Sequence, residues 1–345
     1  MSESLPSRYD RQARFAPLGD DGQRRLLASR ALVCGCGALG SVIAETLVRA
    51  GVGRVRVVDR DFVELNNLQR QVLYDEQDVA DNLPKAIAAA NKLRRINSEI
   101  EIEPIVADVT HQNIGKLAAD VDVIVDGTDN FATRFLLNDF AVKHGKPWIY
   151  GGCIGAEGQT MTIVPGKTAC LACLMADAPP PGTTPTCDTA GIIAPIVNVI
   201  ASIEAAEALK ILSGHEECIS ARLTIIDLWD NQLRQVELSR LHEKGDCRVC
   251  KHHEFAWLAG ERADTSAVLC GRNSVQLSAP LGSSLSLDHL ASRLAGIGRI
   301  ERNAFLLRLY VSDYVVTAFA DGRTIVGGTN DVATARSVHA RYIGA

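Results

Sequence analysis

The first third of the chain alternates short apolar runs with longer amphipathic ones. The apolar run at 31–34 predicts a strand, and the run at 41–50, with apolar residues at helical spacing, predicts a helix. A second apolar run at 54–58 predicts another strand, which ends at Asp59. Strand, glycine-rich turn, helix and strand in this order form one βαβ unit.

The same alternation continues as far as residue 151. Helices are predicted at 85–97, 114–119 and 131–144, and strands at 101–106, 121–126 and 147–151. A further helix at 194–212 and a strand at 223–227 follow. Alternating strands and helices predict an α/β fold: a Rossmann-like mixed, mostly parallel sheet with helices on both faces.

Two changes of pattern divide the chain. Residues 176–189 are rich in Pro, Thr and Gly, a composition that predicts a loop. The first domain is predicted at 1–255, and a small α+β module at 263–345. The module is expected to have about βαββα order: a strand at 268–277, a helix at 287–296, two strands joined by the hairpin signal Asp321-Gly322, and a helix at 331–342.

Composition narrows the classes of function. The 345 residues are 47% hydrophobic with a formal net charge of −5, which disfavours nucleic-acid binding by a basic face. The most apolar stretch, 190–212, contains Glu204 and Glu207 and is expected to be a buried helix rather than a membrane span. Ten cysteines without a secretory signal predict a reducing, cytoplasmic location.

The turn after the first predicted strand has the sequence Gly-Cys-Gly-Ala-Leu-Gly at 35–40. Glycines there permit a tight turn and let backbone N–H groups approach a phosphate at the helix N-terminus. Asp59 ends the second strand, where a carboxylate accepts hydrogen bonds from ribose hydroxyls. These features predict an adenine nucleotide but fit an ATP, nicotinamide or flavin enzyme equally well. The predicted contacts in the turn are Gly35, Gly37, Ala38 and Gly40.

Cations after the second strand favour ATP. The motif Asn-Asn-Leu-Gln-Arg-Gln occupies 66–71, and Lys85 opens the next predicted helix. A triphosphate that loses pyrophosphate builds charge on its bridging and leaving oxygens, which fixed cations such as Arg70 and Lys85 would neutralise. Each of these residues is also compatible with an ordinary solvated surface charge.

A further ligand segment, Asp-Gly-Thr-Asp-Asn at 126–130, directly follows a buried strand. Ligands of α/β sheets bind at this end of the strands. A carboxylate in this segment would help to hold Mg²⁺ on the phosphates. Asn130 is also suited to cap the following helix, and the two roles are compatible.

Cysteines form the second strong pattern. Two Cys-x-x-Cys pairs, at 170–173 and 247–250, suit a tetrahedral zinc site without an open position, which implies a structural role. Core cysteines or a redox dithiol are the alternatives. Cys187 stands apart before a predicted helix, where a thiol becomes a nucleophile if its pKa is lowered, and an inert side chain is as compatible with its position. The predicted zinc ligands are Cys170, Cys173, Cys247 and Cys250.

These motifs, taken in order, resemble the ThiF/MoeB/HesA family, the bacterial relatives of the ubiquitin-activating enzymes. The resemblance covers about residues 5–252. It is carried by Arg-Tyr-Asp-Arg-Gln at 8–12, the turn at 35–40, the motif at 66–71, Pro-Lys at 84–85, Gly-Thr-Asp-Asn at 127–130, the cysteine pairs, and Thr-Cys-Asp-Thr-Ala-Gly at 186–191.

The resemblance implies an adenylyltransferase that activates the C-terminal Gly-Gly of a small β-grasp sulfur carrier protein, for thiamine or molybdopterin biosynthesis. It implies ATP, Mg²⁺ and Zn²⁺ as cofactors and a homodimer in which Arg11 reaches the partner's ATP. Cys187 would form a persulfide or thioester with the carrier. By position, Asp59 would hold the ribose, Asn66, Asn67, Gln69, Arg70, Lys85 and Asn130 would line the nucleotide, and Asp129 would bind Mg²⁺.

The chain departs from the family pattern in three places. Ala38 replaces a common glycine, and Asn82-Leu83 replaces a lead-in that contains glycine. The C-terminal module has Cys270 as its sole cysteine, beside a predicted strand, unlike the sulfur-delivering rhodanese domain of some family members. Carrier docking is the role expected of it. A nicotinamide-dependent oxidoreductase and a non-catalytic nucleotide sensor are the competing hypotheses for the whole chain.

Overall fold

The computed structural model describes residues 6–179, 187–262, 266–269, 273–279 and 283–344. The chain divides into two compact units, Met1–Glu261 and Arg262–Ala345, and each is described here by itself. Cys270 lies outside the described residues, as do positions 180–186 of the predicted Pro-rich loop. No helix among the described segments is both long and apolar enough to cross a membrane.

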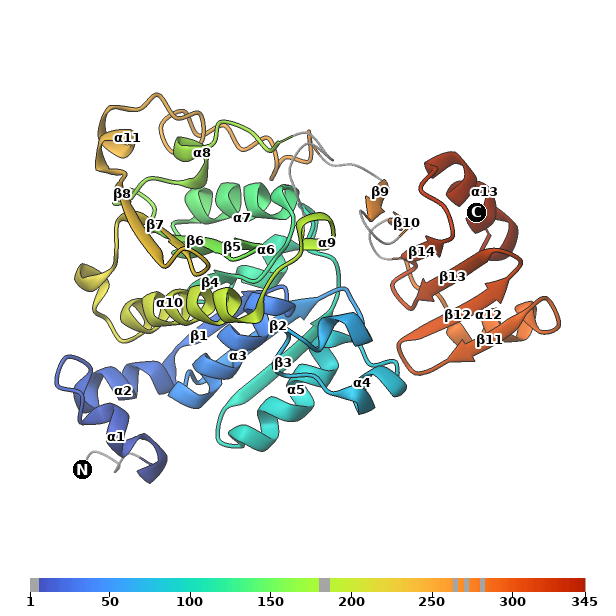
Figure 1. The fold of residues 1–345 in the computed structure, drawn as a ribbon, viewed down its shortest axis with the longest axis horizontal. Coiled ribbons are helices and arrows are strands. Elements are labelled where there is room, and N and C mark those ends of the chain that lie inside the picture. Colours follow the sequence, from blue (N-terminus) through green and yellow to red (C-terminus); the bar gives the residue numbers. More distant parts are fainter. Residues whose placement is uncertain (1–5, 180–186, 263–265, 270–272, 280–282, 345) are drawn as a thin grey trace. The chain divides into compact units, whose positions relative to one another are not determined.

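The first unit is built on an eight-stranded sheet with the order β3-β2-β1-β4-β5-β6-β7-β8 (Figure 1). The five strands from β3 to β5 are parallel, and the remaining three extend the sheet antiparallel. The predicted mixed, mostly parallel sheet is therefore confirmed. The strands are β1 (Arg30–Cys34), β2 (Arg54–Asp59), β3 (Glu101–Val106), β4 (Val123–Asp126), β5 (Trp148–Ile154), β6 (Glu157–Ile163), β7 (Arg222–Asp227) and β8 (Gln232–Glu237).

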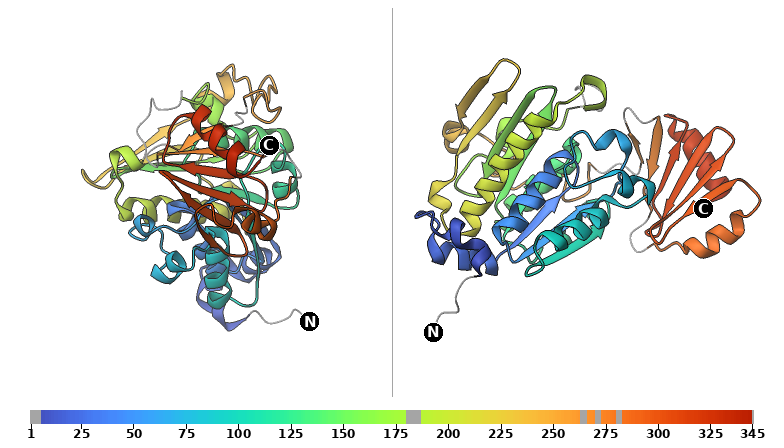
Figure 2. Two further views of the ribbon diagram at one scale, coloured as in Figure 1. Left: turned by 90° about the vertical axis from the view of Figure 1, so that its right-hand side faces the viewer. Right: turned by 60° about the horizontal axis from the view of Figure 1, so that its bottom comes forward.

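Helices cover both faces of this sheet, as Figure 2 shows. On one face α3, α5 and α10 share a core with α2, and on the other α6, α7 and α8 share a second core. These helices are α2 (Gly19–Ala28), α3 (Ala38–Ala50), α5 (Lys85–Ile96), α6 (Ile114–Ala118), α7 (Phe131–His144), α8 (Leu171–Leu174) and α10 (Ala194–Leu212). Shorter helices are α1 (Asp10–Ala13), α4 (Glu76–Ala80), α9 (Cys187–Ala190) and α11 (Ser239–Lys244), with 3-10 turns at Ser7–Tyr9, Leu65–Asn67 and Glu216–Cys218.

The positions predicted from hydrophobic periodicity agree closely with most of these elements. Helices α7 and α10 have the predicted bounds, whereas α3 begins at Ala38, three residues before the predicted start at Ser41. Strands β6 and β8 were not predicted, because their sequences, Glu-Gly-Gln-Thr-Met-Thr-Ile and Gln-Leu-Arg-Gln-Val-Glu, are largely polar. β8 is a wholly exposed strand at the edge of the sheet, where little apolar pattern is needed.

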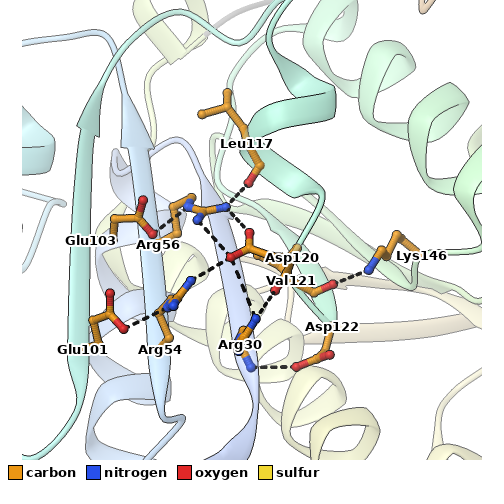
Figure 3. Close-up of polar contacts among 10 residues, drawn as sticks. All are labelled: Arg30, Arg54, Arg56, Glu101, Glu103, Leu117, Asp120, Val121, Asp122 and Lys146. Carbon is orange, nitrogen blue, oxygen red and sulfur yellow. Dashed lines mark hydrogen bonds and ion pairs between the residues drawn. The ribbon is translucent and has the colours of Figure 1, made fainter.

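A network of ion pairs links the amino ends of the parallel strands (Figure 3). Arg56 Nε donates to Glu103 at 2.8 Å and its Nη1 to Asp120 Oδ1 at 2.7 Å. Arg54 Nε donates to Glu101 at 2.9 Å and its Nη1 to Asp120 Oδ2 at 2.7 Å. Asp120 thus joins two arginines of β2. The network is completed by backbone and side-chain contacts of five further residues: Arg30, Leu117, Val121, Asp122 and Lys146.

The second unit contains a six-stranded antiparallel sheet with the order β11-β12-β13-β14-β10-β9, and α12 and α13 pack on its core. The expected βαββα order is wrong, because the strand predicted at 268–277 is two paired strands and because β11 and β12 were not predicted. The backbone of Asn273, with φ 44°, interrupts the extended chain just before β10. The Asp321-Gly322 hairpin is confirmed. The elements are β9 (Ser266–Leu269), β10 (Ser274–Leu277), α12 (Leu287–Leu294), β11 (Arg299–Arg302), β12 (Leu306–Val311), β13 (Tyr314–Phe319), β14 (Thr324–Gly327) and α13 (Val332–Tyr342).

Candidate active site

Three glycines bring two loops together at the carboxyl ends of β1 and β4. Gly35 has φ +84°, and a Cβ built on it would lie 2.7 Å from the Gly127 carbonyl oxygen. A Cβ on Gly127 or on Gly40 would lie 2.4 Å or 1.9 Å from the Gly35 carbonyl oxygen. Backbone therefore packs directly on backbone here. The strand order reverses between β1 and β4, and ligands of open α/β sheets bind at such a reversal.

Asp59, at the end of β2, anchors the glycine turn. Its Oδ2 accepts a hydrogen bond from the Cys36 N–H at 2.6 Å, and its Oδ1 accepts one from the Asp61 N–H at 2.6 Å. Burial raises the pKa of Asp59, while the nearby Lys85 ammonium opposes the increase. Each carboxylate oxygen has a second acceptor position, so Asp59 can also accept hydrogen bonds from ribose hydroxyls.

Lys85 reaches the same edge of the sheet because the chain loops out and returns. The Val63 N–H donates to the Leu83 carbonyl at 3.1 Å and the Lys85 N–H to the Asp61 carbonyl at 2.8 Å. Asn82 supplies the turn with φ 51°, a left-handed conformation that asparagine tolerates, so no glycine is needed in this lead-in. The Lys85 side chain is 5% exposed, with its Nζ 3.5 Å from Asp61 Oδ2.

The motif at 66–71 presents buried amides and one half-buried cation. Asn67 and Gln71 are buried, and each has a side-chain oxygen without a hydrogen-bond partner among the residues that the structure describes. Gln71 Nε2 is 3.7 Å from the position of a Cβ on Gly37, so this amide lies against the glycine turn. Arg70 Nη1 donates to the Asn66 carbonyl at 2.9 Å. Asn66 and Gln69 are exposed.

The loop after β4 is held by a buried ion pair. Asp126 accepts from Arg134 Nε at 3.0 Å and from the Thr128 N–H at 2.8 Å. Arg134 Nη2 also donates to the Gly151 carbonyl at 2.9 Å, which ties the loop to β5. Asn130 caps α7 by accepting from the Thr133 N–H at 2.8 Å, so the capping alternative is correct for this residue. Asp129 is exposed beside it.

Arg11 and Cys187 belong to two short helices, α1 and α9. Arg11 is exposed on α1. Cys187 begins α9, and its side chain lies outside the described part of the chain.

Two residues near the site were missed from the sequence. Arg60 directly follows Asp59 and pairs with Asp108, its Nη1 3.0 Å from Oδ2. Its position next to Asp59 was the signal available. Tyr74 contacts the glycine turn through its hydroxyl, and nothing in the local pattern marked it.

The four cysteines of the two pairs form one cluster, although 77 residues separate corresponding members. All four sulfur atoms lie within 4.8 Å of one another, and three of the separations are 3.7, 3.6 and 3.4 Å. Tetrahedral zinc with Zn–S bonds of about 2.3 Å requires S–S separations of roughly 3.8 Å, so the cluster fits this ion. The sulfur atoms belong to Cys170, Cys173, Cys247 and Cys250.

The chain belongs to the ThiF family, whose model matches residues 9–249. It is an adenylyltransferase: its relatives in this family carry that name or are called E1 activating enzymes. This activity decides against the nicotinamide-dependent oxidoreductase that the glycine turn alone left open.

Two curated relatives show how far the similarity extends. The "Sulfur carrier protein ThiS adenylyltransferase" of Bacillus subtilis is 46% identical over 99% of this chain and 100% of its own length. The "SAMP-activating enzyme E1" of Haloferax volcanii is 40% identical over 70% of this chain and 88% of its own length. Similarity to the first relative therefore includes the C-terminal unit.

Solved structures support the fold. MccB of E. coli, in a crystal structure with MccA-N7isoASN, superposes with a TM-score of 0.61 at 24% identity, over 72% of this chain and 75% of that chain.

Proposed function

We propose that this adenylyltransferase activates the C-terminal Gly-Gly carboxylate of a small β-grasp sulfur carrier protein with ATP, in thiamine or molybdopterin biosynthesis. The observation that carries the proposal is the buried Lys85 cation, which lies beside the ribose acid Asp59 and the glycine turn. The names of two relatives, which specify ThiS and a sulfur carrier protein as substrates, support the choice of carrier.

In the proposed reaction, an oxygen of the carrier's terminal carboxylate attacks the α-phosphorus of ATP. An oxygen–phosphorus bond forms, the α-phosphorus separates from the α,β-bridging oxygen, and pyrophosphate leaves with that oxygen. Negative charge grows on the leaving group, and Lys85 and Arg70 would neutralise it as fixed cations. The buried amides of Asn67 and Gln71 would orient the phosphates through their N–H groups.

The metal ions would have separate roles. Mg²⁺ would neutralise charge on the phosphate oxygens, and Asp129, exposed at the carboxyl edge, is its proposed protein ligand. Zn²⁺ would be held by the four-cysteine cluster, which lies against the core on the α7 face and leaves no ligand position for substrate. The zinc role is therefore structural.

A homodimer would complete the site, with Arg11 reaching the partner's ATP. Phe15 is 64% exposed close to Arg11 in sequence, and Leu65 and Val72 are exposed on either side of the motif at 66–71. A partner subunit would remove these apolar side chains from water.

The unit at 263–345 is proposed to help dock the carrier. This unit has a separate hydrophobic core, so it forms a second module in addition to the proposed adenylyltransferase domain at 1–255. Deletion after Ala259 should raise the KM for the carrier and leave the KM for ATP unchanged. Unchanged kinetics for both substrates would show that the unit has another role.

Exchange of labelled pyrophosphate into ATP tests the proposal. The wild-type chain should catalyse exchange only with a carrier that retains its terminal Gly-Gly. Arg70→Ala and Asp129→Ala should abolish the exchange, whereas Arg24→Ala and Asp21→Ala, matched changes of exposed residues on α2, should not. Full exchange in both site variants would refute the assigned roles.

Cys187 is proposed to act after adenylation. Cys187→Ala should keep carrier-dependent exchange and lose any covalent adduct with the carrier, read by intact-protein mass spectrometry under non-reducing conditions. An adduct that persists in Cys187→Ala would exclude this cysteine as the nucleophile.

A further inference from the structure

Tyr74 is a buried tyrosine whose hydroxyl lies between the two halves of the proposed nucleotide site. Its oxygen is 2.6 Å from the carbonyl oxygen of Cys36 in the glycine turn and 3.2 Å from the carbonyl oxygen of Lys85. The side chain is 7% exposed. Burial raises the pKa of Tyr74 well above its ordinary value, so the phenol keeps its proton and acts as a donor at neutral pH.

The contact to Cys36 determines which way the glycine turn faces. The Cys36 N–H is bound to Asp59 and its carbonyl to Tyr74, so this residue is held from both sides. In a planar trans peptide, the N–H of the next residue points opposite to the carbonyl. With the Cys36 carbonyl turned toward Tyr74, the Gly37 N–H points away from Tyr74. Gly37 directly precedes α3, and the first N–H groups of a helix have no partners within it.

The contact to Lys85 joins the turn to the second half of the site. Lys85 is the first residue of α5, and its own N–H is bound to the Asp61 carbonyl. The Tyr74 hydroxyl therefore touches both the segment that would bind phosphate through backbone N–H groups and the residue that would supply the cation.

We propose that Tyr74 is a positioning residue for ATP: its hydroxyl fixes the glycine turn and the start of α5 relative to each other, so that backbone N–H groups and Lys85 meet the same triphosphate. This inference rests on the proposed function. It assigns Tyr74 no contact with the reacting atoms.

The test is Tyr74→Phe, which removes one hydroxyl and keeps the ring. The Kd of the variant for ATP, measured by calorimetry without carrier, should rise about tenfold, because a buried carbonyl loses its donor and the turn relaxes. The Kd for adenosine, which has no phosphates, should change less than about threefold. In pyrophosphate exchange, the KM for ATP should rise by a larger factor than kcat falls.

Tyr9→Phe is the matched control. Tyr9 is also buried, and its hydroxyl accepts from Asn97 Nδ2 at 2.8 Å, away from the glycine turn. Both variants should have a similarly lowered melting temperature. Only Tyr74→Phe should weaken the binding of ATP more than the binding of adenosine. The inference would be overturned if Tyr74→Phe raised the Kd values for ATP and adenosine by the same factor. It would also be overturned if the Kd for ATP rose no more in Tyr74→Phe than in Tyr9→Phe. A wild-type chain without exchange activity would instead refute the proposed function itself.

Discussion

The two edges of the large sheet differ in how their charged and polar side chains are paired. At the amino edge, the arginines of β2 are paired with Glu101, Glu103 and Asp120, and hydrogen bonding to Arg56 lowers the pKa of Asp120. At the carboxyl edge, burial raises the pKa of Asp59, and the side-chain amide oxygens of Asn67 and Gln71 have no hydrogen-bond partner within the described part of the chain. The same fold thus has one edge that is internally satisfied and one that is not.

This difference indicates what each edge is for. A paired network contributes to stability without any ligand, and its arginines have little capacity left to bind one. Buried polar groups without partners are costly, so they persist where a ligand completes them. The carboxyl edge also carries the backbone-on-backbone glycine contacts, which hold the loops after β1 and β4 against each other.

The largest effect should come from a cation at the carboxyl edge. Lys85→Met keeps most of the buried aliphatic stem and removes the charge, so carrier-dependent pyrophosphate exchange should fall about 100-fold or more. Arg54→Met, at the amino edge, removes a charge from the paired network and should leave exchange near the wild-type rate. Comparable losses of exchange in the two folded variants would remove the functional contrast between the edges.

A stability effect should come from the amino edge. Arg56→Met leaves Glu103 and Asp120 without their main partner, and the free energy of unfolding should fall by about 2 kcal/mol, measured by guanidinium titration at pH 7. The pKa of Asp120 is lowered in the folded state, so its stabilising contribution is present above its ordinary pKa and is lost as pH falls through the folded value. The deficit of Arg56→Met should therefore shrink in acid. A deficit that stays constant with pH would show that packing, not charge, dominates.

Substitutions of two glutamates on the same helix, α10, should have smaller effects on stability, and the two effects should differ. Glu207 accepts from Thr162 Oγ1 at 2.9 Å and from the Ser220 N–H at 2.8 Å. Both carboxyl oxygens of Glu204 are buried and find no hydrogen-bond partner in the segments that the structure describes. Glu204 lies against Gly151, where a Cβ would be 2.3 Å from its carboxyl carbon. Glu207→Gln should lower stability by about 1 kcal/mol, because it weakens these bonds.

Glu204→Gln should instead change how the stability of the protein depends on pH. Burial raises the pKa of Glu204 well above its ordinary value, so the folded state retains a proton that the unfolded state has lost. Wild-type stability should therefore fall as pH rises from the ordinary glutamate pKa toward the folded one. Glu204→Gln should remove this slope and be more stable than wild type at pH 8, by thermal unfolding. Equal stability of Glu204→Gln and wild type at pH 5 and pH 8 would show that Glu204 has an unseen partner.

The sequence predicted the fold of the first unit where the pattern was local. Apolar strands and amphipathic helices alternate through β4 and α7, and the glycine turn marks the reversal of strand order. The polar strands β6 and β8 and the C-terminal sheet could not be derived in this way, because their pairing partners, not their periodicity, define them.

The candidate residues that the structure brings together are those for which chemistry and spacing coincide in the sequence. The cysteine pairs converge from distant segments, and Asp59 and Lys85 meet at one edge. Tyr74 was not predicted, since its role depends on a return of the chain, through Asn82 and Pro84, that no local motif encodes.

A crystal structure with a non-hydrolysable ATP analogue and Mg²⁺ tests the central claim most directly. We expect phosphate oxygens within hydrogen-bond distance of Lys85 Nζ and the Arg70 guanidinium, and ribose hydroxyls that donate hydrogen bonds to Asp59. A nucleotide bound elsewhere, away from Lys85 and with Arg70 in bulk water, would contradict it.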